Sequence, residues 1–298
     1  MHACTPRRGR ARGFTLIEII LVLVIIATLA GLVISQVGML GRSADMSATA
    51  KNQQDVANQI GMYFVLQKRM PTRMDSLLHD VAGTPTVLPL ATRAGVTTGV
   101  NSENQGWGLP LGGANGTNVH AQLVASDLAA LTTPAGNFAR SFTRAGFVDL
   151  VDHAAWSAGG NCNNSGLATA PRALGNSAGG CWVARVVTTT NGDTVPATAG
   201  AIVRQIYPHL DGALPDGVVA LVAVGVGPSS SLIPDTMLSA PIYPGCDGSY
   251  YGRYIAYFAV FASGERAQLV GVSDSYGRFP NYSIQQFNES LPNNARQG

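Results

Sequence analysis

Charged residues are scarce in this 298-residue chain, where Asp, Glu, Lys and Arg together make up only 12%. A globular domain usually carries about twice that share. Hydrophobic residues reach 46%, which provides for a sizeable core and excludes a disordered chain. The 35 glycines, with abundant Ala, Thr, Ser and Asn, take the place of the missing charges. This composition favours a secreted or surface-exposed protein over a cytosolic enzyme.

A basic surface is also missing once the N-terminus is set aside. The formal net charge is +2, but Arg7, Arg8, Arg10 and Arg12 crowd residues 1–13, which contain no Asp or Glu. Without these residues, 15 basic side chains face 17 acidic ones and the net charge is near −2. No basic stripe then remains to indicate a nucleic-acid surface, so no nucleic-acid partner is predicted.

Cysteine is rare, with four residues in the chain. Cys4 lies in the basic leader, which leaves Cys162, Cys181 and Cys246. In an oxidising compartment these three allow one disulfide. A Cys162–Cys181 bond would close a short loop rich in Gly and Asn, and Cys181–Cys246 is its rival. Three unpaired buried thiols are the remaining alternative.

One long hydrophobic run stands out, because Ile19 to Leu40 contains no charged residue. Glu18 lies at its head and the arginine cluster precedes it. About 20 apolar residues span a bilayer, and the arginines would keep the N-terminus in the cytoplasm. A charge inside such a segment costs roughly 2.5–3.5 kcal/mol at a helix centre. Glu18 is therefore expected to have a function and a partner.

Two general interpretations account for this region only in part. A secretory signal peptide would need a short apolar core and a cleavage site such as Thr28-Leu29-Ala30. Glu18 interrupts that core, however, and the apolar run continues past Ala30. A plain signal anchor explains the run and the arginines but gives Glu18 no role.

The third interpretation explains the carboxylate. Gly13-Phe14-Thr15-Leu16-Ile17-Glu18 closely resembles the prepilin-peptidase motif of type IV pilins and of the pseudopilins of type II secretion systems. The resemblance implies cleavage after Gly13 and methylation of the new N-terminal Phe14. It also implies that Glu18 pairs with the N-terminal amine of a neighbouring subunit, since a buried carboxylate is tolerable beside a cation.

This resemblance implies the partners and the location as well. The partners would be prepilin peptidase, other pilin or pseudopilin subunits contacted through the N-terminal helix, and the inner membrane. The precursor would cross that membrane once with a cytoplasmic N-terminus, and the processed chain would join a periplasmic or cell-surface fibre. No cofactor is implied.

The helix is predicted to continue beyond the apolar run. Val56, Ile60, Tyr63 and Phe64 form one apolar stripe at helical spacing, where a globular head would pack. We expect helix from Phe14 to about Lys68, ended by Pro71. Three parts follow: a leader at 1–13, a transmembrane and assembly helix at 14–70, and a periplasmic or extracellular head at 71–298.

Two further features of the helical region bear on the family. The segment Met70–Leu78 looks like the Pro-Thr and short-helix element that follows the long helix in many pseudopilins. Many major pilins also carry a proline inside the long helix, and this chain has none there. That departure favours a minor or specialised subunit over the bulk subunit of a long fibre.

In the head, the predicted helices come before the predicted strands in the sequence. Residues 80–118 are predicted to be irregular, and helices are expected near Val119–Leu131 and Phe138–His153. Segments rich in β-branched and aromatic residues predict four strands: Trp182–Thr190, Val218–Val226, Tyr254–Ala262 and Ala267–Ser273. Ser263–Arg266 reads as a hairpin turn. This order predicts an α+β fold with an antiparallel sheet packed on the N-terminal helix.

Catalytic patterns are weak. Gly175-Asn176-Ser177-Ala178-Gly179 fits a nucleophile elbow, with Asp193 and His209 following in the order of a hydrolase triad. The elbow needs a strand before the serine and a helix after it, whereas a Gly/Asn loop and a predicted strand flank Ser177. No catalytic residue is predicted, although a membrane-anchored periplasmic hydrolase using Ser177 remains an alternative function.

No metal site is predicted either. Asp149, Asp152 and His153 cluster at one predicted helix end, where solvated charges are common. Asp247 lies in a turn dipeptide and lacks the series of aspartates that forms a calcium-binding loop. An aromatic cluster is interpreted as core rather than as a ligand surface: Tyr243, Tyr250, Tyr251, Tyr254, Tyr257, Phe258 and Phe261. The sequence therefore predicts a structural pilus or pilus-like subunit, with a secretion pseudopilin as the alternative within the same machinery.

Overall fold

The computed structural model describes residues 16–81, 84–87, 124–127, 136–153, 169–173, 182–188, 200–210, 212–244, 251–275 and 277–281. The chain divides into two compact units, residues 1–45 and 46–298. Helix α1, Leu16–Gln67, contributes to both units. It agrees with the helix expected from Phe14 to about Lys68. In the described part of the chain, no helix contains a stretch long and apolar enough to cross a membrane.

Helix α1 ends before the proline that was expected to stop it. Lys68 has a φ of 56° and its N–H donates to the carbonyl of Phe64 at 2.8 Å, which is the left-handed residue that commonly closes a helix. Pro71, itself buried, lies in the linker between α1 and β1. The chain therefore leaves the helix by turning at Lys68, and Pro71 follows the turn.

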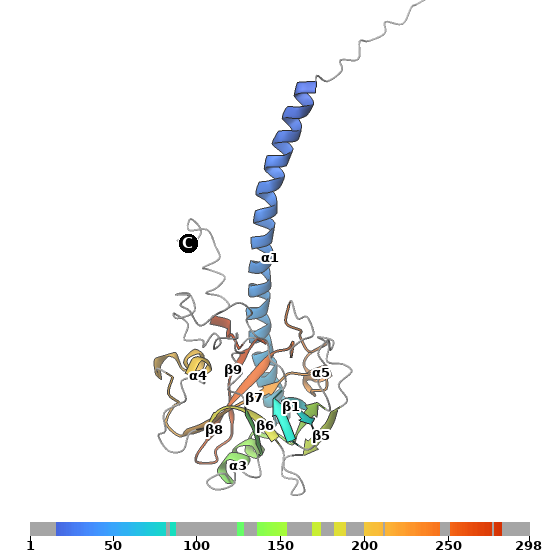
Figure 1. The fold of residues 1–298 in the computed structure, drawn as a ribbon. Coiled ribbons are helices and arrows are strands. Elements are labelled where there is room, and N and C mark those ends of the chain that lie inside the picture. Colours follow the sequence, from blue (N-terminus) through green and yellow to red (C-terminus); the bar gives the residue numbers. More distant parts are fainter. Residues whose placement is uncertain are drawn as a thin grey trace, which may run out of the picture. The chain divides into compact units, whose positions relative to one another are not determined.

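The second unit is built on a nine-stranded sheet (Figure 1). In chain order its strands are β1 Met74–Val81, β2 Thr84–Val87, β3 Val124–Asp127, β4 Asp149–His153, β5 Thr169–Ala173, β6 Trp182–Thr188, β7 Val218–Gly225, β8 Ile255–Phe261 and β9 Gln268–Ser273. The main path runs β3-β6-β7-β1-β4-β5, with β2 beside β1 and the β8–β9 hairpin beside β7. The other elements among the described residues are helices α3 Gly136–Ala145, α4 Gly200–Ile206 and α5 Leu232–Asp235, and the 3-10 helix η1 Pro208–Leu210.

The sheet is mixed, which corrects the expected antiparallel sheet. Strands β1 and β4 are parallel, whereas β7 pairs with β6 and β8 in antiparallel fashion. A parallel pair needs a long crossover connection, and the chain between β1 and β4 contains helix α3. The α+β class itself is confirmed by the order of the elements.

Strands β7 and β8 are buried on both faces of the sheet. On β7, Val222 and Val224 belong to one hydrophobic cluster and Leu221 and Ala223 to another. Because successive side chains of a strand point to opposite faces, the two clusters lie on opposite sides of the sheet. The first cluster contains residues of α1 and α3, and the second contains residues of α4.

The apolar stripe of α1 packs as predicted. Val56 and Ile60 are fully buried, Tyr63 is 1% exposed, and Phe64 packs at the edge of the same cluster. The aromatic residues assigned to the core are buried at Tyr251, Tyr254, Tyr257 and Phe258, which confirms that interpretation for them. The head is therefore fixed to α1 by direct burial of one helix face.

The four predicted strands are confirmed as β6, β7, β8 and β9, and the turn Ser263–Arg266 joins the last two. Gly264 adopts a φ of 69° in that turn, a conformation that glycine accommodates without strain. Strands β2 and β5 and helix α4 were not predicted.

Three helix predictions in the head are wrong in whole or in part. The Met70–Leu78 segment forms β1 instead of a short helix, and the region Val119–Leu131 contains strand β3. The helix expected over Phe138–His153 ends at Ala145. Gly146 ends it with a φ of 88°, at a spot where an added Cβ would lie 2.5 Å from the Cα of Arg69. The chain then continues as β4.

Replacing Ile60 by alanine should destabilise the head by about 2–5 kcal/mol, because it leaves a cavity between α1 and the sheet. Met62→Ala is the matched control on the same helix, since Met62 is 45% exposed; it should change stability by less than about 0.5 kcal/mol. Denaturant unfolding of the full chain in detergent measures both. Equal losses would contradict the packing of α1 described above.

Candidate functional site

The beginning of α1 combines one carboxylate with apolar side chains. Glu18 lies in the first turn of the helix, where the helix dipole stabilises a negative charge by roughly 0.3–1 kcal/mol. Its neighbours Leu16, Ile17 and Ile19 are 76%, 74% and 51% exposed. Gly13 and Phe14, the predicted cleavage and methylation residues, lie outside the described part of the chain. The carboxylate is thus displayed among apolar groups.

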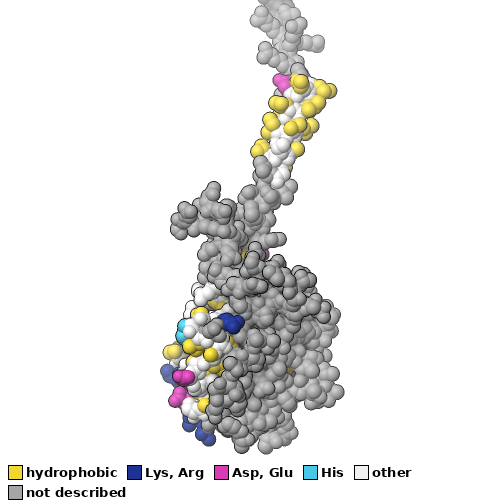
Figure 2. Space-filling view, turned by 60° about the vertical axis from the view of Figure 1, so that its left-hand side comes forward, with side chains coloured by type: hydrophobic (Ala, Val, Ile, Leu, Met, Phe, Trp, Pro, Cys, Tyr) yellow, Lys and Arg dark blue, Asp and Glu magenta, His cyan; other side chains and the backbone are white. Residues whose placement is uncertain are grey.

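The apolar surface of this segment surrounds the helix. Six consecutive residues, Leu21 to Ile26, are each between 48% and 62% exposed. Consecutive helical residues are about 100° apart, so apolar side chains point in every direction around the axis. Figure 2 shows apolar side chains along the face of this segment that is turned to the viewer. The hydroxyl of Thr28 is satisfied inside the helix by the carbonyl of Ile25 at 2.9 Å. Such a helix differs from the second half of α1, where Val56, Ile60 and Tyr63 are buried in the core of the head.

A buried ion pair closes the turn after β9. The Asp274 Oδ2 atom lies 2.6 Å from Nη2 and 2.7 Å from Nε of Arg278, and Oδ1 accepts the backbone N–H of Arg278 at 3.0 Å. The Asp274 side chain is fully buried. Gly277 completes the turn with a φ of 75°. The four-residue spacing and the glycine are the sequence signals that could have revealed this turn.

Tyr243 completes the surroundings of this ion pair. Its hydroxyl accepts a hydrogen bond from Nη2 of Arg278, and the guanidinium carbon lies 5.6 Å from its ring centroid. Burial alone would lower the pKa of Arg278, but the Asp274 carboxylate and Tyr243 raise that pKa above its ordinary value. Arg278 is therefore a permanent cation in this turn.

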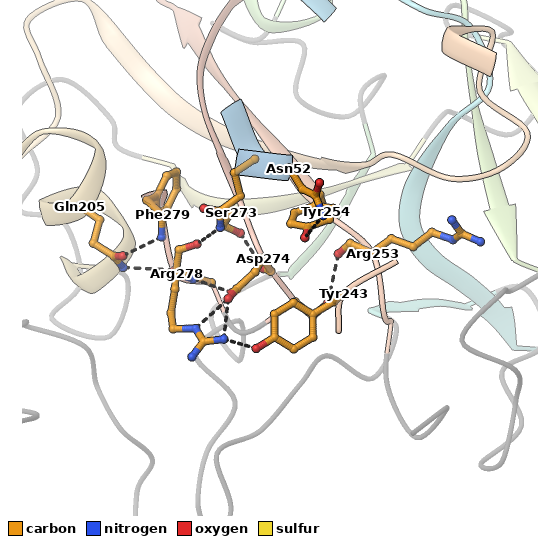
Figure 3. A network of polar contacts seen from close by, with 12 residues as sticks. Asn52, Gln205, Tyr243, Arg253, Tyr254, Ser273, Asp274, Arg278 and Phe279 are labelled. Carbon is orange, nitrogen blue, oxygen red and sulfur yellow. Dashed lines mark hydrogen bonds and ion pairs between the residues drawn. The ribbon is translucent and has the colours of Figure 1, made fainter. Parts of the chain in front are cut away.

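The turn closed by Asp274 and Arg278 is hydrogen-bonded both to α1 and to α4 (Figure 3). From α1, Gln53 donates through Nε2 to the carbonyl of Arg278 at 2.5 Å. From α4, Gln205 donates to the carbonyl of Gly277 at 3.2 Å and accepts the N–H of Phe279 at 3.2 Å. A further bond links Asn52 Nδ2 to the hydroxyl of Tyr254 at 3.1 Å. These contacts fix α1 against the C-terminal hairpin by directional bonds as well as by packing.

A second buried polar pair lies between β1 and the segment before β8. The hydroxyl of Tyr251 donates to Oδ2 of Asp75 at 2.7 Å; the two residues are 0% and 1% exposed. A Cβ on Gly225 would lie 2.2 Å from that hydroxyl, and a Cβ on Gly227 would lie 2.2 Å from Asp75 Oδ2. The pair therefore requires glycine at both positions. Burial raises the pKa of Tyr251, and the nearby Asp75 carboxylate raises it further.

The structure places only some of the candidate catalytic, metal-binding and disulfide residues. Asp149, Asp152 and His153 lie on strand β4 instead of at a helix end, and Asp149 Oδ1 accepts the N–H of Arg73 at 2.8 Å. His209 lies exposed in η1. Within the described ranges, no three His, Cys, Asp or Glu side chains are grouped so as to hold a metal ion. The others lie outside the described residues: Ser177, Asp193, Asp247, Cys162, Cys181 and Cys246.

Comparison with known proteins adds one finding. Residues 8–34 match the family model described as the prokaryotic N-terminal methylation motif, which is the prepilin-type signal of type IV pilins and pseudopilins. No curated protein and no solved structure matches the chain. The motif supports membership of the pilin and pseudopilin family and indicates a structural subunit. It implies processing by prepilin peptidase and assembly with other pilins.

Replacing Asp274 by alanine should cost about 3–5 kcal/mol, because it leaves the Arg278 cation buried without its anion. The double replacement Asp274→Ala with Arg278→Met should cost less, since it removes both charges. Asp235→Ala, at an exposed position, is the control with little effect. Denaturant midpoints of the full chain in detergent measure all three. A double variant less stable than Asp274→Ala would contradict a charge-based role.

Stability should fall above about pH 10. In the unfolded chain a tyrosine loses its proton near its ordinary pKa of about 10, whereas burial raises the pKa of Tyr251 and of Tyr257 in the folded protein. Above pH 10 the unfolded state therefore binds fewer protons, and each such tyrosine removes about 1.4 kcal/mol per pH unit. The stabilising difference is fully present below pH 10.

Denaturant midpoints between pH 8 and pH 11 measure this slope. Tyr257→Phe removes one of the titrating groups, so its slope above pH 10 should be shallower than that of the unsubstituted chain. A slope unchanged by Tyr257→Phe would show that Tyr257 ionises as readily in the folded state as in the unfolded state.

Proposed function

We propose that this chain is a structural subunit, minor or specialised, of a type IV pilus or pilus-like fibre. Its precursor is inserted in the inner membrane with the N-terminus in the cytoplasm, and prepilin peptidase cleaves it after Gly13. Phe14 is then methylated, and the subunit joins the fibre through α1. The observation that carries the proposal is the match of residues 8–34 to the methylation motif.

The geometry of α1 supports this assignment. A helix that is hydrophobic on all sides is stable in water only when other apolar groups cover it, as in a bilayer or a bundle of helices. Residues 16–29 expose large apolar side chains all around, and the second half of α1 already holds the head. The helix therefore offers one segment for assembly and another for attachment of the folded unit.

Glu18 supplies direction to that assembly. We expect its carboxylate to pair with the N-terminal amine of Phe14 in a neighbouring subunit, because each charge offsets the desolvation of the other. Apolar packing alone allows helices to slide along one another, whereas one charge pair fixes their register. A secretion pseudopilin uses the same motif, so it is the alternative assignment within this machinery.

Mass spectrometry of the mature chain tests the processing. The expected product begins at Phe14 and carries one methyl group on its amine. An intact Met1, or a chain that begins at Gly31 as a signal peptide would leave it, contradicts the proposal.

Glu18→Ala should leave membrane insertion unchanged and reduce recovery in sheared fibres by more than about tenfold, because it leaves the partner amine without its anion. Glu265→Ala is the matched control, since Glu265 is exposed in the β8–β9 turn and should assemble normally. Comparison of the membrane and fibre fractions by immunoblot measures the effect. Normal recovery of Glu18→Ala in fibres would remove Glu18 from its proposed role.

A further inference from the structure

The last turns of α1 display an exposed surface that is both apolar and basic. Met62, Val65 and Leu66 are 45%, 62% and 67% exposed and follow the i, i+3, i+4 spacing of one helix face. Exposed cations adjoin them. We call these residues the basic patch: Met62, Val65, Leu66, Lys68, Arg69, Arg144 and Arg266.

Specific contacts hold the parts of the basic patch together. The guanidinium carbon of Arg266 lies 4.5 Å from the ring centroid of Phe64, one turn before Lys68. Arg144 donates through Nη1 to the carbonyl of Gly264 at 2.8 Å. The N–H of Met70 donates to the carbonyl of Ala145 at 3.1 Å, which brings the end of α3 against the end of α1. Three separate segments thus bring four cations together near the end of α1.

Ser231, which precedes the loop of residues 235–242, is bonded both to α1 and to the chain that follows it. Ser231 accepts the N–H of Thr72 at 2.9 Å and donates to the hydroxyl of Tyr63 at 2.9 Å. Tyr63 and Phe64 are consecutive residues, so they leave the helix about 100° apart. Phe64 contacts Arg266 of the basic patch, so Arg266 and Ser231 approach α1 from different directions.

This loop, residues 235–242, carries an apolar and an acidic group at its exposed side. Leu238 is 101% exposed, Ile242 is 37% exposed, and the exposed Asp235 precedes them. A single exposed leucine is ordinary on a protein surface, so exposure by itself indicates nothing. What distinguishes Leu238 is how firmly the backbone on both sides of it is held.

Hydrogen bonds fix the loop before and after Leu238. The N–H groups of Thr236 and Met237 both donate to the carbonyl of Leu232 at 2.9 Å. Arg253, which is only 3% exposed, donates through Nη1 to the carbonyl of Ala240 at 2.7 Å. Burying a cation is costly, and here part of the offset comes from a loop carbonyl. A loop held in one conformation binds a partner with less loss of entropy.

We propose that the 235–242 loop of one head docks onto the basic patch of a second copy of the chain. Leu238 would cover Met62 and Val65, and Asp235 would face Lys68 and Arg69. The two surfaces match in apolar character and are opposite in charge. They are different surfaces of the same head, so the contact is head-to-tail and repeats from subunit to subunit. This inference rests on the proposed fibre function, to which it adds a contact between heads.

The apolar strip favours a protein over a polyanion such as nucleic acid. A phosphate backbone would pair with Arg144 and Arg266 but would leave Met62, Val65 and Leu66 without an apolar partner. Arginine and methionine are also enriched at protein interfaces, where lysine is depleted, and three of the four cations of the basic patch are arginines.

Cysteine cross-linking between two differently tagged full-length chains tests the contact. One chain carries Leu238→Cys and the other Val65→Cys; they are produced together and oxidised mildly. The expected product is a disulfide-linked dimer that contains both tags. Gln54→Cys replaces Val65→Cys in the matched control, because Gln54 is exposed about three turns earlier on the same helix. Chains without introduced cysteines give the background from the natural ones.

Charge reversal gives the second arm of the experiment. Lys68→Glu with Arg69→Glu on the Val65→Cys chain should reduce the mixed dimer about tenfold, and Asp235→Lys on the Leu238→Cys chain should restore it. Lys51→Glu, at an exposed position earlier on α1, should have no effect.

Absence of the mixed dimer overturns the head-to-tail contact, and so does cross-linking of Val65→Cys to a different protein in its place. Recovery of the chains in sheared fibres is scored separately. Fibres without the cross-link refute the contact alone, whereas chains that never enter fibres refute the proposed function.

Discussion

The burial of one face of α1 against strands β7 and β8 is the interaction on which the second unit depends. Val56, Ile60 and Tyr63 fill that contact, and β8 supplies Ala256, Phe258 and Val260 to the same cluster. A sheet exposes an apolar face until another element covers it. Removing α1 would therefore uncover the first cluster. The second half of the helix is therefore part of the core of the head.

The polar contacts around this core restrict how α1 can sit on the sheet. Apolar packing tolerates small displacements, but hydrogen bonds depend steeply on distance and angle. Gln53 bonds the turn closed by Asp274 and Arg278, Asn52 bonds Tyr254, and Tyr63 bonds Ser231. These bonds occur at both ends of the buried stripe. They fix the rotation of the helix, and with it which side chains of its last turns face outward.

The sequence allowed accurate prediction wherever one local signal dominated. Alternating or β-branched runs identified β6, β7, β8 and β9, and helical spacing identified the stripe at Val56 to Phe64. The errors fell where two signals competed. Met74 to Leu78 is apolar enough for a helix or a strand, and pairing with β4 and β7 decides for strand. Likewise, Gly146 ends α3 where the apolar pattern continues into β4.

The candidate sites, too, were predictable only where one local signal in the sequence marked them. Glu18 could be found from the sequence because a single charge beside a long apolar run is unusual. The pairs Asp274–Arg278 and Asp75–Tyr251 could not be found in this way. Asp274 and Arg278 become partners through the turn after β9. Asp75 and Tyr251 become partners through the pairing of β1 with β7 and of β7 with β8. The basic patch also could not be found from the sequence, because its cations come together only on folding. Residues 14–298 have a net charge near −2 and no basic run, yet folding gathers Lys68, Arg69, Arg144 and Arg266 from three segments.

That gathering has a physical consequence for any assembly of the chain. A head with evenly mixed charges would meet its neighbours in many orientations of similar energy. A head with cations gathered near the end of α1, and with Asp235 beside the exposed Leu238 elsewhere on its surface, favours orientations in which opposite charges and apolar groups meet. In the proposed fibre, the N-terminal segment, apolar on all sides, would give strong but poorly directed association. Specific orientation would then have to come from groups such as Glu18 and from the surfaces of the head.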